Sequence, residues 1–145
     1  MPEVFVTERM IEFSDTDAAG IAHFSAFVRF MEQAEHAFLR SLGQSVVIDL
    51  EDGWHLSWPR VHVDCDFLGT ARFEDVLQIK VRIGKLGTKS IHYDFEISCG
   101  DKAVAKGNLS SVCCRVKAGC PLESVPIPEW LRSKLAPYLI APVAD

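Results

Sequence analysis

A short acidic turn, residues 14 to 20 with the sequence SDTDAAG, carries the residues of this chain that are best placed for chemistry. Asp15 and Asp17 are two positions apart, and Gly20 follows them just ahead of a predicted helix. A helix start offers unpaired backbone N–H groups and the positive end of the helix dipole, which together stabilise an oxyanion. A carboxylate just upstream can attack an ester-like carbon or activate a water against it. The same residue types also form an ordinary turn and helix cap, and taken alone the turn favours that structural interpretation.

The acidic turn does not continue as a metal-binding loop. An EF-hand needs further spaced oxygen ligands and a closing Glu, whereas this chain runs on into Ile21, Ala22 and Phe24. The chain has five cysteines and no CxxC pair, which argues against a zinc site and a disulfide framework. We expect no metal and no cofactor, and we interpret the cysteines as buried, reduced side chains; they are Cys65, Cys99, Cys113, Cys114 and Cys120.

The element that must position the turn is the most strongly periodic segment of the chain. Apolar residues recur at steps of three and four, which predicts one helix with a wide apolar face. They are Phe24, Phe27, Val28, Met31, Ala34, Phe38 and Leu42. Gly43 suits a C-terminal cap, and Ser25 or the turn before it suits the start. At about 1.5 Å per residue the helix is roughly 30 Å long, and its wide apolar arc predicts that other elements wrap around it.

Strand patterns supply that wrapping. Residues 3 to 13 alternate imperfectly, and the segments 60–67, 76–83, 91–97 and 102–117 follow, the last with an irregularity near Gly107 and Asn108. In the second of these strands the alternation predicts an inward face made of Val61, Val63, Cys65 and Phe67. Short connections imply antiparallel pairing, and a helix from Pro128 to Leu135 ends the pattern. The sequence therefore predicts an α+β fold in one domain, residues 1–145, with a curved antiparallel sheet around one long helix.

Composition excludes several classes of function. The net charge is -5 and no basic run offsets it, so we expect no nucleic-acid partner. No apolar run approaches the roughly 18 residues that a membrane span needs. The N-terminal stretch MPEVFVTERM lacks the pattern of a signal peptide, so we expect a cytoplasmic protein. A Gly-x-Ser-x-Gly elbow is absent from the sequence, which argues against a serine hydrolase.

The stretch from Phe13 to Phe24, the helix ending at Leu42 and Gly43, and the strands from Arg60 to Val116 together resemble the 4-hydroxybenzoyl-CoA thioesterase family. The likeness covers nearly the whole chain. It implies a hotdog fold and an acyl-CoA thioesterase that hydrolyses its substrate to the free acid and CoA. CoA then enters only as part of the substrate and product.

The resemblance also implies roles for individual residues. Asp17 matches the catalytic carboxylate, and the backbone N–H of Phe24 or of its neighbour His23 matches the group that polarises the thioester carbonyl. Asp15 is expected to hold the turn through backbone hydrogen bonds. The His23-Phe24 pair and residues 25 to 27 depart from the pairs common in relatives. The side chain of His23 is therefore both a candidate catalytic group and a candidate helix-start residue that contacts Asp17 or solvent.

Substrate binding is expected at a second place. Thr88, Lys89 and Ser90 correspond to the turn where relatives hold the CoA phosphates, with Arg82 and Lys85 nearby; a solvated turn is the alternative. Aromatic residues that would line an acyl pocket, or else belong to the core or a subunit interface, are Phe27, Phe30, Trp54 and Trp58. Three histidines without an identified carboxylate partner are interpreted as non-catalytic: His55, His62 and His92.

The resemblance further implies a homodimer or homotetramer, with sheets paired edge to edge and each active site built from two subunits. Three functions stay open. The first is a thioesterase for an aromatic or medium-chain acyl-CoA, and the likeness of DTDAAG to dihydroxynaphthoyl-CoA thioesterases makes an aryl substrate one option. The second is another hotdog enzyme such as a dehydratase, which needs a paired His and Asp in the helix region. The third is a non-catalytic module that binds acyl-CoA or acyl-carrier protein. A thioesterase for acyl-carrier protein also stays open, as does the choice between nucleophile and general base for Asp17.

Overall fold

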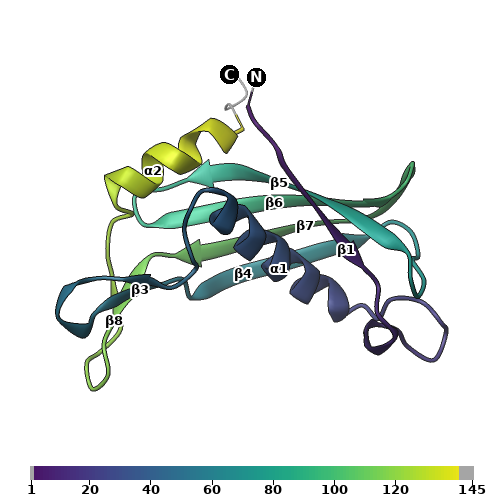
Figure 1. The fold of residues 1–145 in the computed structure, drawn as a ribbon, viewed down its shortest axis with the longest axis horizontal. Coiled ribbons are helices and arrows are strands. Elements are labelled where there is room, and N and C mark those ends of the chain that lie inside the picture. The colour runs from purple at the N-terminus through teal and green to yellow at the C-terminus, as the bar shows by residue number, and fades with distance from the viewer. Residues whose placement is uncertain (1, 141–145) are drawn as a thin grey trace.

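In the computed structural model, which describes residues 2–140, a five-stranded antiparallel sheet curves around one long helix (Figure 1). The helix α1 runs from Ala26 to Ser41. The strands lie in the order β1-β5-β6-β7-β4, so both edge strands come from parts of the chain that are distant in sequence. Their bounds are β1 Phe5–Met10, β4 Arg60–Phe67, β5 Val76–Leu86, β6 Ser90–Cys99 and β7 Lys102–Val112. The predicted α+β fold is confirmed.

Smaller elements close the ends of the sheet. A second sheet has the order β2-β3-β8-β9, with the bounds Ile48–Asp49, His55–Ser57, Cys114–Val116 and Glu123–Ser124. Helix α2, Glu129–Leu135, starts directly after Pro128, as predicted. Three 3₁₀ turns, η1 to η3, span Phe13–Asp15, Glu51–Gly53 and Ala136–Tyr138. None of the helices within residues 2–140 combines the length and the hydropathy that crossing a bilayer requires.

Two predicted strand boundaries were wrong. The strand predicted over residues 3–13 ends at Met10, because the chain turns into the 3₁₀ turn at Phe13. The long last strand divides at Cys113, where the chain leaves the large sheet for the small one. By contrast, helix α1 starts at Ala26 directly after Ser25, which was one of its two predicted starts. The irregularity expected near Gly107 lies instead opposite the junction of Ile97 and Ser98, where the register of β6 against β7 shifts.

The core is the layer between α1 and the concave face of the sheet. The strict alternation on β5 and β6 is confirmed, because every second side chain is buried against the helix. Gly107 packs closely against both α1 and β4: an added Cβ would lie 2.5 Å from the Met31 Sδ and 2.8 Å from the carbonyl oxygen of Asp64. Glycine is therefore required in the middle of β7.

Strand β4 departs from the predicted burial. Val61, Val63 and Phe67 were expected to face inward, yet 63%, 43% and 52% of their surfaces are exposed. The reason is that β4 is an edge strand that α1 covers only in part, which the alternation of its residues cannot reveal. Of the cysteines predicted to be buried, Cys113 and Cys114 are buried, Cys65 and Cys99 are partly buried, and Cys120 is exposed; all five are free thiols.

One carboxylate lies inside this core. Glu35 on α1 is 1% exposed and accepts a hydrogen bond from the guanidinium of Arg60 at the start of β4. Burial raises the pKa of Glu35 to about 7, against the opposing attraction of Arg60. The contact joins the central helix to the edge strand.

The raised pKa predicts a pH dependence of stability. Below about pH 4.5 Glu35 is neutral in both the folded and unfolded chains; between about pH 4.5 and 7 the folded chain holds the proton more tightly. The contribution of Glu35 to the free energy of unfolding therefore falls as the pH rises through this window, by up to about 3 kcal/mol. Glu35→Gln should remove that dependence. Urea unfolding of both proteins from pH 4.5 to 8 measures it.

The control for this experiment is Glu32→Gln, which removes an exposed carboxylate near the same arginine. Burial lowers the pKa of the neighbouring His36, so His36 adds stability as the pH rises, in the sense opposite to Glu35. Glu35→Gln also removes the carboxylate that lies 3.5 Å from His36 Nε2, and Glu32→Gln removes a charge that raises the pKa of both Glu35 and His36. The fall in stability between about pH 4.5 and 7 should therefore persist in Glu32→Gln and disappear in Glu35→Gln. Parallel pH curves for wild type and Glu35→Gln would contradict the prediction.

Candidate active site

Asp15 anchors the acidic turn from inside. Its side chain is buried, its Oδ2 accepts the backbone N–H of Glu12 at 2.8 Å, and Arg9 and Arg29 lie 3.2 and 3.4 Å from its two oxygens. The carbonyl oxygen of Asp15 accepts the backbone N–H of His23 at 2.7 Å. Asp15 therefore holds both ends of the turn together, as expected of a structural aspartate.

Asp17 lies at the tip of the turn, and one of its two carboxylate oxygens is hydrogen-bonded. The Oδ1 atom accepts the backbone N–H of Ala19 at 2.8 Å, and the carbonyl oxygen accepts that of Gly20 at 3.0 Å. Gly20 has a φ of 78°, a conformation that favours glycine and lets the chain reverse here. Within residues 2–140 no hydrogen bond or ion pair engages Oδ2. One carboxylate oxygen is thus fixed in direction, while the other is available to a substrate or a water.

The hydrogen bonds of the backbone ahead of α1 differ between His23 and Phe24, whose N–H groups were the two candidates for polarising the thioester carbonyl. The N–H of His23 is used by the carbonyl oxygen of Asp15, whereas that of Phe24 finds no acceptor among the described residues. Of these two candidates, Phe24 is therefore the one whose N–H is available to a substrate oxygen. This N–H lies two residues ahead of Ala26, the first residue of α1, and so close to the positive end of the helix dipole.

The side chain of His23 turns toward the helix rather than toward Asp17. Its Nδ1 accepts the backbone N–H of Ser25 at 3.1 Å and lies 2.8 Å from the Ser25 Oγ. A ring nitrogen that accepts an N–H carries no proton, so this geometry corresponds to the tautomer with the proton on Nε2. The ring packs against that of Phe24, with 4.5 Å between centroids.

A cavity of about 210 Å³ brings the predicted groups together. Asp17, Phe24 and Phe27 line it, and Phe67 closes it with its ring edge-on to Phe27 at 5.4 Å. The remaining lining residues, which sequence reasoning missed, are Ile21, Ala22, Gly69, Thr70 and Ala71. Apart from the carboxylate of Asp17 and the hydroxyl of Thr70, the side chains that line the cavity are apolar, which suits an uncharged carbonyl compound better than an ion.

The other predicted aromatic residues lie elsewhere. Phe30 and Trp58 are buried in the core. Trp54 lines a wide, open depression beside α2, where the guanidinium of Arg115 lies 4.4 Å above its ring.

One of the three histidines interpreted as non-catalytic differs from expectation. His62 has a carboxylate partner, because its Nε2 lies 2.7 Å from Asp64 Oδ2. This exposed pair is on β4, outside the lining of the cavity.

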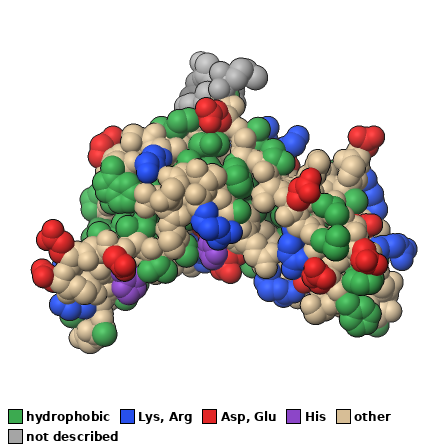
Figure 2. All heavy atoms as spheres, in the orientation of Figure 1, with side chains coloured by type: hydrophobic (Ala, Val, Ile, Leu, Met, Phe, Trp, Pro, Cys, Tyr) green, Lys and Arg blue, Asp and Glu red, His purple; other side chains and the backbone are tan. Residues whose placement is uncertain are grey.

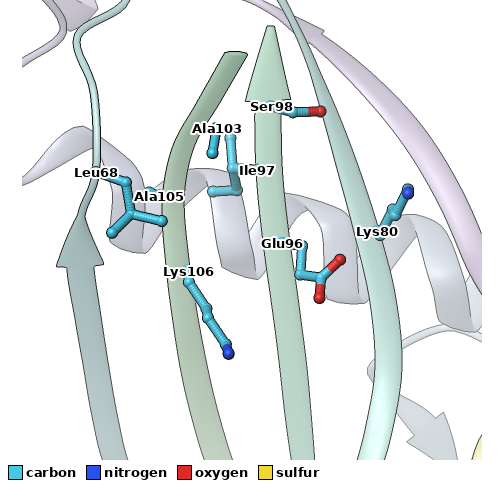
Figure 3. A pocket seen from close by; sticks show the side chains of 8 residues that line it. All are labelled: Leu68, Lys80, Glu96, Ile97, Ser98, Ala103, Ala105 and Lys106. Atoms are coloured by element: carbon cyan, nitrogen blue, oxygen red, sulfur yellow. The ribbon is translucent and has the colours of Figure 1, made fainter. Parts of the chain in front are cut away.

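A second hollow, of about 260 Å³, lies on the sheet and is drawn in Figure 3. Its charged residues are Lys80, Glu96 and Lys106, which face one another across β5, β6 and β7 with alternating sign. The hollow has no helix N-terminus and no unpaired carboxylate. It is therefore a solvated row of compensating charges, and the chemistry points to the cavity beside Asp17. On the face in Figure 2, basic side chains likewise lie scattered among acidic ones rather than gathered in a patch.

The predicted phosphate-binding residues are not brought together with Asp17 inside one chain. Thr88, Lys89 and Ser90 lie at the turn between β5 and β6, beside α2 on the left of Figure 1. The acidic turn lies at the opposite end of the sheet, since Met10 pairs with Val76 at the start of β5. Strand β5 alone has 11 residues, which corresponds to about 35 Å.

Comparison with known proteins shows that this chain is similar to thioesterases in both sequence and structure. A family model described as the thioesterase-like superfamily matches residues 11–135. A 1,4-dihydroxy-2-naphthoyl-CoA hydrolase of Crocosphaera subtropica is 31% identical over 132 residues, covering 86% of this chain and 93% of the relative. A solved structure of a 1,4-dihydroxy-2-naphthoyl-CoA thioesterase from Synechocystis gives a TM-score of 0.79 at 24% identity, covering 92% and 96% of the two chains. A mutant 4-hydroxybenzoyl CoA thioesterase complexed with 4-hydroxybenzoyl CoA also gives 0.79, at 23% identity, covering 91% and 98%. The predicted hotdog fold is confirmed.

Proposed function

The chain belongs to the thioesterase-like superfamily, and on that premise we propose that it hydrolyses acyl-CoA thioesters to a free acid and CoA. The observation that carries the proposal is the cavity beside the acidic turn. It joins a carboxylate with a free oxygen, Asp17, to a free backbone N–H at a helix start, Phe24, within an apolar lining. A module that only binds acyl-CoA gains nothing from a carboxylate next to an electrophilic carbon.

In the proposed mechanism the thioester oxygen accepts the N–H of Phe24, and the dipole of α1 stabilises the negative charge that develops there. Asp17 acts in one of two ways. As a nucleophile its carboxylate bonds to the carbonyl carbon, the C–S bond breaks, CoA leaves as a thiolate, and water then cleaves the mixed anhydride. As a general base it takes a proton from a water that adds to the same carbon. The C–S bond then breaks, and CoA again leaves as a thiolate.

We assign His23 a positioning role in this mechanism. Its backbone N–H binds the carbonyl oxygen of Asp15, its own carbonyl oxygen accepts the N–H of Ala26 at 2.9 Å, and its Nδ1 accepts the N–H of Ser25. These hydrogen bonds occupy the backbone donors on both sides of Phe24. The proposal needs neither a metal nor a cofactor.

We further propose that the working enzyme is a homodimer, or a tetramer of such dimers, joined through β4. This strand has one unpaired edge, and both of its faces are largely exposed, whereas every second residue of the other edge strand, β1, is partly covered. A long exposed edge with apolar side chains favours pairing with another strand. A two-fold contact pairs β4 with its own copy in antiparallel orientation.

Such pairing accounts for the distance between the two predicted parts of the site. The two-fold axis reverses the partner, so the partner's turn with Thr88, Lys89 and Ser90 lies at the same end as this chain's Asp17. With strands about 4.8 Å apart, that turn is roughly 15–20 Å from this chain's β4, a span suited to the extended pantetheine arm of CoA.

For the acyl group we propose an aryl ring. Phe24, Phe27 and Phe67 offer ring faces and edges to it, and the named relatives act on 1,4-dihydroxy-2-naphthoyl-CoA. The test is release of free thiol from aryl-, short-, medium- and long-chain acyl-CoA thioesters. Turnover highest with an aryl-CoA is the expected result. Saturable binding of acyl-CoA without turnover would overturn the proposal in favour of a binding module or a carrier-protein substrate.

A further inference from the structure

A side chain from the C-terminal helix holds the turn to which the proposed function assigns the CoA phosphates. The turn, Gly87 to Ser90, closes the β5–β6 hairpin, with the N–H of Gly87 bonded to the carbonyl oxygen of Ser90 at 2.8 Å. Arg132 of α2 reaches it from 44 and 45 residues away. Its Nη2 donates to the carbonyl oxygens of Gly87 and of Thr88, the latter at 3.1 Å.

Other segments bind the remaining carbonyl groups of the same turn. The Thr88 carbonyl oxygen also accepts the N–H of Ile127 at 2.9 Å, and the Lys89 carbonyl oxygen accepts the N–H of Cys113 at 2.6 Å. By contrast, no acceptor within residues 2–140 engages the N–H groups of Thr88 and Lys89. The acceptors of the turn are therefore used by the protein, and its two central donors remain free.

The charges around the turn have one sign. Arg132 is partly buried, and no carboxylate in the described part of the chain lies within ion-pair distance of it. The exposed Lys89 has its Nζ 3.3 Å from the Ser124 Oγ, again without an acidic partner among those residues. Consecutive free N–H groups backed by uncompensated cations form a concavity that attracts anions.

From this arrangement we propose that Arg132 is the positioning residue of the CoA phosphate site. It holds the carbonyl oxygens of Gly87 and Thr88 away from the ligand, so that the N–H groups of Thr88 and Lys89 face a phosphate. Its own charge adds to the potential there. The assignment rests on the proposed thioesterase function for its substrate, and it gives α2 a role in binding CoA.

The experiment compares two thioesters of the same acyl group, one of CoA and one of N-acetylcysteamine, which lacks the nucleotide and all phosphates. Arg132→Gln should raise KM for the CoA thioester by about ten- to a hundredfold, as expected for the loss of charge-assisted hydrogen bonds, with kcat little changed. Hydrolysis of the N-acetylcysteamine thioester should stay as in wild type. Arg132→Lys, which keeps the charge, should restore part of the affinity.

Lys134→Gln is the matched control, because it removes one positive charge from the same helix at a side chain that contacts Leu42 and Trp130 instead of the turn. Its kinetics should match wild type. Equal losses on both thioesters in Arg132→Gln, or no loss on either, would overturn the proposal. If Arg132→Gln fails to fold, Arg132→Lys decides: an unchanged KM for the CoA thioester rejects the role.

A failure of the proposed function gives a different result. A wild type that cleaves neither thioester contradicts hydrolysis but leaves the phosphate site to be tested directly. Calorimetric titration with adenosine 3′,5′-bisphosphate, which carries the 3′-phosphate and the inner 5′-phosphate of CoA, serves that purpose. Binding by wild type and Lys134→Gln, with at least about tenfold weaker binding by Arg132→Gln, supports the role of Arg132. Equal binding by all three proteins rejects it.

Discussion

Asp17→Asn is expected to lower kcat for an aryl-CoA thioester by about 10²- to 10⁴-fold, the range of a positioned acid–base group, and by more if Asp17 is the nucleophile. An amide can neither form the mixed anhydride nor accept the proton from water. It keeps the Oδ1 acceptor for the N–H of Ala19, so the turn should persist. Free-thiol release under saturating substrate measures the loss. Titration with the unhydrolysed substrate should show that the variant still binds it.

The matched control is Asp75→Asn. Asp75 also caps a tight turn, since its Oδ2 accepts the N–H of Arg72 at 2.8 Å, but it does not line the cavity. Its replacement should leave kcat within about twofold of wild type, because the amide preserves that acceptor. Comparable activity in Asp17→Asn and Asp75→Asn would remove Asp17 from the mechanism.

Val63→Glu is expected to dissociate the proposed dimer and to abolish most of the activity on CoA thioesters. An unpaired carboxylate buried at an interface costs about 3–5 kcal/mol, which weakens association by roughly 10²- to 10⁴-fold. Each separated subunit would keep its own Asp17 but lose the partner's phosphate-binding turn. Light scattering coupled to size-exclusion chromatography measures the mass, and kcat/KM with an aryl-CoA measures the function.

Val6→Glu provides the comparison at the other edge of the sheet. Val6 on β1 is 47% exposed, against 43% for Val63, so both changes place a charge on a similarly exposed edge-strand valine. Val6→Glu should keep the mass and activity of wild type. The opposite outcome, dissociation by Val6→Glu alone, would move the subunit contact to β1.

Local sequence patterns correctly predicted side-chain burial in the central elements of the fold. The alternation in β5 and β6 and the three- and four-residue steps of α1 predicted which side chains are buried, because those elements lie in the middle of the sheet or against it. The acidic turn was also predictable. The spacing of Asp15, Asp17 and Gly20 directly specifies backbone hydrogen bonds and a left-handed residue.

What the sequence did not predict depends on contacts between distant segments. Val61 and Val63 are exposed because β4 lies at the edge of the sheet. The alternation of residues within one strand does not predict where that strand lies in the sheet. Phe67 and Ala71 join the cavity only because the chain after β4 returns to the acidic turn, where the N–H of Ala22 binds the Ala71 carbonyl oxygen at 2.8 Å. The link from Arg132 to Gly87 is equally non-local.

In the proposed mechanism Phe24 is the backbone donor for the developing oxyanion, because the N–H of His23 is bonded to the Asp15 carbonyl oxygen. A site with so few donors depends strongly on how readily the leaving group departs. A thiol has a pKa of about 8.5, whereas water, which resembles an alcohol in this respect, has a pKa of about 15.7. Thiolates therefore leave far more easily than alkoxides, and we expect this arrangement to favour thioesters over oxygen esters through the intrinsic reactivity of the bond rather than through recognition of sulfur.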